Sequence, residues 1–205
     1  GTYRLFEDVR KRSSGLEFSF VDLSDSKKLQ EAIRPNTKMI WVESPTNPLL
    51  KLVDLSVIAK FAKDNNIISV CDNTFCSPYI QKPLDFGIDI VVHSATKYLN
   101  GHSDVVGGVV VCAEDREDLS DDMFYLSNSV GGILSPFDSF LLLRSLKTLS
   151  VRMDRHCESA LKLSKFLENH KAIEKVIYPG LISHPQHHVA KKQMHKFGGM
   201  ITAIL

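Results

Sequence analysis

The sequence lacks the features of several large protein classes. Its four cysteines show no C-x-x-C spacing, which argues against a disulfide framework and is typical of reduced thiols in the cytosol. The 25 basic and 24 acidic residues give a net charge of +1 without a basic stripe, so no nucleic-acid partner is indicated. No apolar run is long enough to span a membrane, and no signal-peptide pattern is seen. We therefore expect a cytoplasmic protein that acts on a small molecule, with no membrane partner.

The motifs of several enzyme classes are also missing. No G-x-G-x-x-G opens a helix after a strand, and neither a Walker loop nor G-x-S-x-G occurs, so nucleotide binding and serine hydrolysis lack their loops. His184, His187 and His188 cluster, but no cysteines or carboxylates are spaced to complete a tetrahedral metal site with them. We expect no metal site.

The hydrophobic pattern alternates short apolar runs with amphipathic stretches. Because the apolar runs are short and do not alternate with polar residues, they are typical of strands buried on both faces. The chain therefore predicts an α/β fold with a mostly parallel sheet covered by helices. Strands are expected at 18–21, 38–43, 67–71, 88–92, 105–112, 176–178 and from 199, and helices at 1–12, 25–33, 55–65, 115–127, 137–149, 151–169 and 184–195.

A change in pattern near Ser150 predicts a domain boundary. Residues 1–150 form the expected larger domain, and residues 151–205 begin a smaller one. The chain starts at Gly1 and closes on the apolar stretch Met200–Leu205, so we expect it to be part of a longer polypeptide.

The stretch Ile88–Asp104 organises the chemistry that the sequence suggests. An apolar run stops at His93, and Ser94, Thr96 and Lys97 follow at the mouth of the predicted strand. Two hydroxyls beside a lysine can hold a phosphate ester while the amine attacks an aldehyde, a combination that suggests pyridoxal phosphate. An isolated S-x-T-K is more often just a solvated lysine where a strand ends.

Two further strand ends carry residues suited to the same cofactor. Asn47 lies in a turn stiffened by two prolines, and Asp72 and Thr74 follow the predicted strand 67–71. Alone, Asn47 would be a turn residue and Asp72 a turn or N-cap residue. In a parallel sheet, however, the carboxyl ends of strands gather on one edge. A carboxylate there could keep a heteroaromatic nitrogen protonated.

These residues also match the signature of a known family. The sequence resembles the Cys/Met-metabolism enzymes that depend on pyridoxal phosphate, the trans-sulfuration family, over essentially the whole chain. The matching blocks are Gly1–Arg4, Glu43–Pro48, Asp72–Phe75, Ser94–Tyr98, Gly101–Asp104, Ser135–Asp138, Leu146–Leu149, Val151–Met153 and Tyr178–Leu181.

The resemblance implies a fold and a set of residue roles. The fold would be that of fold-type-I, aspartate aminotransferase-like enzymes. Lys97 would carry the cofactor as an internal aldimine and move protons, and Asp72 would bind the pyridine nitrogen. Ser94 and Thr96 would bind the phosphate. Asn47 would lie near the phenolic oxygen of the ring, and Thr74 would pack beside it.

The resemblance further implies an activity and an assembly. The expected reaction is α,γ-elimination of L-cystathionine to cysteine, 2-oxobutyrate and ammonia, because His102–Val106 and Ser183–His187 look most like γ-lyase or the similar γ-synthase. γ-Replacement on an O-acyl homoserine by cysteine is the runner-up, and methionine γ-elimination is third. The implied assembly is a homotetramer that shares active sites between subunits. In the family, the ring-stacking tyrosine and the substrate-carboxylate arginine lie outside the segment seen here, so a non-catalytic core fragment or interaction module stays an alternative.

Overall fold

The computed structural model describes residues 1–205, and the chain divides into two compact units, Gly1–Thr37 and Lys38–Leu205. Every residue predicted for the cofactor site lies in the second unit. No helix is both long enough and apolar enough to cross a membrane. The domain boundary predicted near Ser150 stays a prediction.

The first unit is helical, with bounds α1 (Thr2–Arg4), the π-helical segment η1 (Leu5–Arg10), α2 (Lys11–Ser14) and α3 (Ser26–Ala32). The side chain of Asp25 caps α3 by accepting a hydrogen bond from Lys27 N at 3.0 Å. Both predicted helices of this unit are therefore confirmed. The strand predicted at 18–21 is wrong, because no strand pairs with these residues. Instead, Phe18 stacks its ring on Phe6 at a centroid distance of 4.8 Å.

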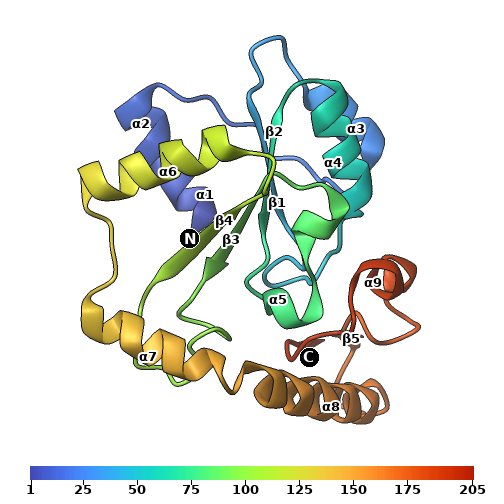
Figure 1. Ribbon diagram of the computed structural model, residues 1–205. Coiled ribbons are helices and arrows are strands. Elements are labelled where there is room, and N and C mark those ends of the chain that lie inside the picture. Colours follow the sequence, from blue (N-terminus) through green and yellow to red (C-terminus); the bar gives the residue numbers. More distant parts are fainter. The chain divides into compact units, whose positions relative to one another are not determined.

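The second unit is built on a four-stranded sheet, visible in Figure 1. Its strands are β1 (Met39–Glu43), β2 (Ile68–Asp72), β3 (Ile90–Ser94) and β4 (Gly108–Cys112), in that order across the sheet. β1, β2 and β3 are parallel, and β4 pairs antiparallel with β3. The mostly parallel sheet predicted from the sequence is confirmed, whereas the reversed direction of β4 was not foreseen.

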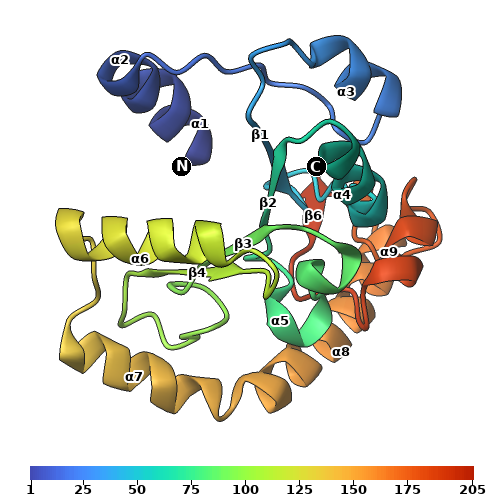
Figure 2. The ribbon, with the colours of Figure 1, turned by 45° about the horizontal axis from the view of Figure 1, so that its top comes forward.

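Helices surround this sheet. They are α4 (Leu55–Asp64), α5 (Ser77–Ile80), the 3-10 helix η2 (Pro83–Phe86), α6 (Glu117–Val130), α7 (Pro136–Leu146), α8 (Leu149–Glu168) and α9 (His187–Gln193). A small antiparallel sheet pairs β5 (Lys175–Ile177) with β6 (Thr202–Ile204). Figure 2 shows α6 on one side of β3 and β4 and α7 on the other.

Two hydrophobic clusters show how the layers are held. On the α6 side, Leu119 packs with Val70 and Ile90 of the sheet. A larger cluster joins α5, α7, α8 and α9 to the turn after β3, and its buried members include Ile80, Leu99, Leu142, Met153 and Ala190. Burying such apolar side chains supplies most of the driving force for folding. The carboxyl end of β3 is thus fixed between packed helices.

Candidate functional site

The carboxyl ends of the three parallel strands lie side by side. Glu43 at the end of β1 is opposite Asp72 at the end of β2, and Asp72 is opposite Val92 of β3. Since side chains alternate along a strand, Ser94 lies on the same sheet face as Val92, Asp72 and Glu43. The sheet thus presents two carboxylates and a hydroxyl on one face at one edge.

Hydrogen bonds join the ends of β2 and β3. Asp72 Oδ1 accepts a bond from Thr74 N at 3.0 Å, and Thr74 Oγ1 accepts one from Ser94 N at 2.8 Å. The Thr74 hydroxyl proton remains available to a ligand, because its oxygen serves only as acceptor in that bond. Asp72 is half-buried and forms no ion pair. Three of the predicted residues are therefore connected to one another.

Lys97 lies in the tight turn that follows β3. Lys97 N donates to Ser94 O at 3.2 Å, and Gly101 N donates to Lys97 O at 2.7 Å, while the lysine side chain is exposed. Thr96 Oγ1 accepts a hydrogen bond from Gly107 N at 3.0 Å, and its hydroxyl donates one to Gly107 O at 3.4 Å. Gly107 was not predicted as a site residue, and its sequence signal is the glycine pair Gly107–Gly108, whose second member begins β4.

Arg152 of α8 holds this turn through backbone carbonyls. Its Nη1 donates to Tyr98 O at 2.7 Å, and its Nη2 donates to Ser145 O at 3.0 Å. Burial lowers the pKa of Arg152, and no carboxylate compensates for this. Gly101 has φ +72°, and a Cβ atom there would overlap the Arg152 guanidinium. The turn that carries Lys97 thus depends on a residue that is far along the chain.

Asn47 is exposed on the loop after β1, which contains cis bonds before Pro45 and Pro48. Its backbone N donates to Glu43 Oε1 at 3.1 Å. Burial raises the pKa of Glu43, and the nearby Asp72 carboxylate raises it further. The structure gives the Asn47 side chain no bond to the other predicted residues. Asn47 is therefore linked to the sheet edge only through Glu43.

His93 is a buried neighbour of the site that the sequence reasoning missed as a candidate. Its Nδ1 has no hydrogen-bond partner, and burial lowers the pKa of its imidazole. Because it alternates with Ser94, it lies on the opposite face of the sheet.

The donor set at the sheet edge fits pyridoxal phosphate. Ser94 and Thr96 supply hydroxyls for a phosphate ester, Lys97 supplies an exposed primary amine for an aldehyde, and Asp72 supplies a carboxylate without a protein cation. The phosphate, the aldehyde and the ring nitrogen of the cofactor thus each have a chemically matched group at or just after the carboxyl ends of β2 and β3.

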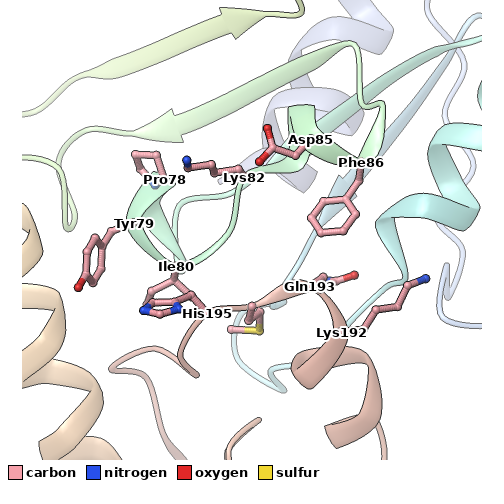
Figure 3. Close-up of a pocket in the computed structure, with 10 residues that line it drawn as sticks. Pro78, Tyr79, Ile80, Lys82, Asp85, Phe86, Lys192, Gln193 and His195 are labelled. Atoms are coloured by element: carbon pink, nitrogen blue, oxygen red, sulfur yellow. The ribbon is translucent and has the colours of Figure 1, made fainter.

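A separate pocket of about 440 Å³ lies between α5, η2 and the end of α9. Figure 3 shows Tyr79, Lys82 and Phe86 from the segment that contains α5 and η2. It also shows Gln193 and His195 from the end of α9 and the residues after it. None of the predicted cofactor residues lines this pocket. We therefore place the candidate site at the sheet edge, where the chemically matched groups gather.

Comparison with known proteins identifies the family of the chain. The model of the family described as Cys/Met metabolism PLP-dependent enzymes matches residues 1–205. The chain is 60% identical over 205 residues to a cystathionine β-lyase of Coxiella burnetii, covering 100% of this chain and 53% of that protein. It is 51% identical over 202 residues to a cystathionine γ-lyase of Bacillus subtilis, covering 98% of this chain and 52% of that protein.

A solved structure gives the same result. The crystal structure of cystathionine γ-lyase from Lactobacillus plantarum complexed with L-serine superposes with a TM-score of 0.97 at 47% identity, covering 100% of this chain and 53% of that one. This chain therefore spans about half the length of the relatives that it matches. The fold is the fold-type-I α/β architecture, and the cofactor of the family is pyridoxal phosphate. Because the family model matches all 205 residues, the chain belongs to the Cys/Met metabolism family of pyridoxal phosphate-dependent enzymes.

Proposed function

We propose that the protein is a carbon–sulfur lyase that cleaves L-cystathionine by α,γ-elimination to cysteine, 2-oxobutyrate and ammonia. The observation that carries this proposal is the sheet edge where Asp72, Thr74 and Ser94 are joined by hydrogen bonds next to the Lys97 turn. Membership of the Cys/Met metabolism family supports the substrate class.

The proposed roles follow from the chemistry of each side chain. Lys97 Nζ attaches the cofactor, and Asp72 keeps the pyridine nitrogen protonated through its carboxylate. Ser94 and Thr96 bind the phosphate, and Thr74 packs beside the ring. Asn47 is proposed to lie near the phenolic oxygen. When bound, pyridoxal phosphate withdraws electrons from the α-carbon of the substrate.

Lys97 is also the proposed base. Its amine would take the proton from the α-carbon of the bound substrate and would serve the later proton transfers that γ-elimination requires. The bond between the γ-carbon and sulfur breaks, and the sulfur leaves as the thiol of cysteine. One water molecule is consumed as ammonia and 2-oxobutyrate are released.

A second candidate is β-elimination of the same substrate. It is favoured by the 60% identity to a protein named cystathionine β-lyase. β-Elimination breaks the carbon–sulfur bond on the other side of the sulfur, so the products are homocysteine, pyruvate and ammonia. γ-Replacement is also supported by a relative, because the chain is 49% identical to a probable cystathionine γ-synthase of Herpetosiphon aurantiacus. Methionine γ-elimination rests on the sequence resemblance alone.

The identity of the keto acid separates these activities. The full-length protein, loaded with pyridoxal phosphate, should convert cystathionine to 2-oxobutyrate and an equal amount of cysteine. Formation of pyruvate and homocysteine instead would show that the protein catalyses β-elimination and not γ-elimination. Formation of cystathionine from an O-acyl homoserine and cysteine, without a keto acid from cystathionine, would instead identify a synthase.

The attachment of the cofactor can be tested on the same protein. Borohydride reduction followed by peptide mass analysis should find the cofactor on Lys97, and Lys97→Ala should abolish attachment. Lys97→Arg is the matched control, because it keeps the positive charge without a primary amine. An unmodified wild-type protein would favour the non-catalytic alternative, and an attached cofactor in Lys97→Ala would mean that another lysine carries it.

The homotetramer and the cytoplasmic location stay predictions. Light scattering on the full-length protein tests the first, since a molar mass four times that of one chain is expected.

A further inference from the structure

Three buried carboxamide side chains are joined by hydrogen bonds, and the first of them lies between two predicted cofactor residues in the sequence. We call Asn73, Gln81 and Gln193 the amide chain; their exposed fractions are 0%, 1% and 5%. A buried carboxamide is costly unless its donors and acceptors are matched, and a matched network gives a structure one defined arrangement. The bonds that the amide chain makes therefore indicate which parts of the molecule it fixes.

Asn73 stands between Asp72 and Thr74 in the chain. Its N donates to Val92 O at 3.0 Å, and its Nδ2 donates to Gln81 O at 2.7 Å. Nδ2 also reaches Ser77 O at 3.2 Å, and the Asn73 carbonyl accepts from Ser77 N at 2.9 Å. Every polar group of Asn73 is thus engaged, so the backbone of its two neighbours is held in place.

Gln81 connects the ends of β1 and β2. Its Nε2 donates to Asn73 Oδ1 at 2.9 Å and to Ser44 O at 3.2 Å, and Ser44 directly follows Glu43. Its Oε1 accepts from Gln193 Nε2 at 3.1 Å. One side chain therefore contacts both strand ends and α9.

Gln193, the last residue of α9, anchors the far end. Its Oε1 accepts from Leu55 N at 3.2 Å, and its Nε2 also donates to Val53 O at 3.0 Å. It also lines the pocket shown in Figure 3. Because the N–H of Leu55 can donate only to the oxygen of the carboxamide, it fixes which end of the Gln193 side chain is Oε1 and which is Nε2. That orientation sets the direction of Gln81 and, through it, of Asn73.

We propose that Gln81 and Gln193 are positioning residues for the cofactor, acting through Asn73 on Asp72 and Thr74. This inference rests on the proposed function, because it takes Asp72 as the partner of the ring nitrogen. The amide chain holds the Asp72 carboxylate and the Thr74 hydroxyl at the sheet edge and ties their position to α9. A small displacement of such groups weakens binding and catalysis strongly.

Gln81→Met in the full-length protein tests the proposal, since methionine has a similar size but cannot make the three side-chain bonds. The probe is pyridoxal phosphate, added to the cofactor-free protein and followed by absorbance. We expect its dissociation constant to rise by roughly 10- to 100-fold. We also expect the pH midpoint of the visible absorbance change of the bound cofactor to shift, because Asp72 no longer holds the ring nitrogen as well.

Gln186→Met is the matched control. Gln186 is the N-cap residue of α9, and its Oε1 accepts from Leu52 N at 2.8 Å, but it contacts no member of the amide chain. This variant should lose thermal stability while the dissociation constant and the pH midpoint of the cofactor stay at wild-type values.

Gln193→Met provides a second, milder test, because it leaves the bond between Gln81 and Asn73 intact. It should weaken cofactor binding by several-fold, less than Gln81→Met does. If Gln81→Met does not fold, Gln193→Met tests the inference in its place. A Gln193→Met protein that binds the cofactor with wild-type affinity and shows the wild-type pH midpoint would overturn it.

Different measurements test the role of the amide chain and the proposed function. A Gln81→Met protein that loses stability like Gln186→Met, yet binds and titrates the cofactor normally, would mean that the amide chain only supports the fold. If Lys97→Ala also abolishes attachment in that case, the proposed function stands without the amide chain. Attachment that persists in Lys97→Ala would remove the proposed function itself.

Discussion

At the scale of single residues, the turn after β3 depends on Gly101. Gly101 combines a positive φ with a position against Arg152, whose guanidinium satisfies the backbone carbonyls of this turn. Because Gly101 follows Lys97 by four residues and bonds to its carbonyl, any change there is transmitted to the lysine.

Gly101→Ala should therefore destabilise the protein by more than backbone strain alone. A left-handed conformation costs an alanine roughly 1–2 kcal/mol, and forcing a methyl group into packed atoms costs roughly 1–3 kcal/mol more. Gly131→Ala is the control, since Gly131 also has a positive φ, +77°, but no atom lies within 4 Å of the added Cβ. Urea unfolding measures the free energy of unfolding of both variants. Equal losses in the two would show that the Arg152 side chain moves aside without an energetic cost.

At the scale of elements, α4 is joined to α9 by the residue that begins it. Asp54 accepts hydrogen bonds from Ser56 N at 3.1 Å and Val57 N at 3.4 Å, as an N-cap does, and it also pairs with Lys192 Nζ at 2.8 Å. The same side chain thus starts one helix and holds another.

The two contributions of Asp54 can be separated. Asp54→Asn should retain the cap and lose only the ion pair, for a cost of about 0–1 kcal/mol. Asp54→Ala should lose the cap as well, which adds about 1 kcal/mol. Lys192→Met should match Asp54→Asn in thermal unfolding. If Asp54→Asn were as unstable as Asp54→Ala, the ion pair rather than the cap would be the main contribution.

The elements show what sequence patterns can and cannot predict. The strands expected at 38–43 and 67–71 are confirmed as Met39–Glu43 and Ile68–Asp72. Short apolar runs bounded by turn residues are typical of buried strands in an α/β protein, so their positions could be predicted. The direction of β4 was not predictable, since an apolar run carries no information about which way it pairs. The strand expected at 18–21 failed because alternating aromatic residues can also pack on a helix.

At the scale of the whole molecule, stability should depend on buried histidines. His184 Nε2 contacts Leu50 O at 3.1 Å, and its Nδ1 accepts from Gln186 N at 3.1 Å, so a second proton on the ring would break the latter bond. Burial lowers the pKa of His184 below its ordinary value of 6.5 and lowers the pKa of His93 in the same way.

A lowered pKa means that the unfolded chain binds protons more readily than the folded one. The stability contributed by neutral His184 is therefore fully present above pH 6.5 and is lost as pH falls through its folded pKa. The loss is about 1.4 kcal/mol for each unit by which the folded pKa lies below the unfolded one. The free energy of unfolding should fall between pH 7.5 and pH 5.5, and less steeply in His184→Gln. Identical slopes in the two proteins would rule out His184 as a source.

The candidate site was predictable only where chemistry and sequence spacing coincide. Ser94, Thr96 and Lys97 are close in sequence, and Asp72 follows a recognisable strand, so these four are singled out once the strand ends are taken together at one sheet edge. Gln81 and Gln193 carry no such signal, because they are 112 residues apart and a glutamine has no characteristic spacing.

The reversed edge strand has one more consequence. Since β4 runs against its neighbours, its first residues, not its last, arrive where β1, β2 and β3 finish, and this is how Gly107 comes to meet Thr96. The loop that leads into β4 therefore shares a rim with the loops that leave the other strands. Changes in its length or sequence would move the hydroxyl of Thr96, a proposed phosphate ligand, while leaving the lysine and aspartate loops as they are.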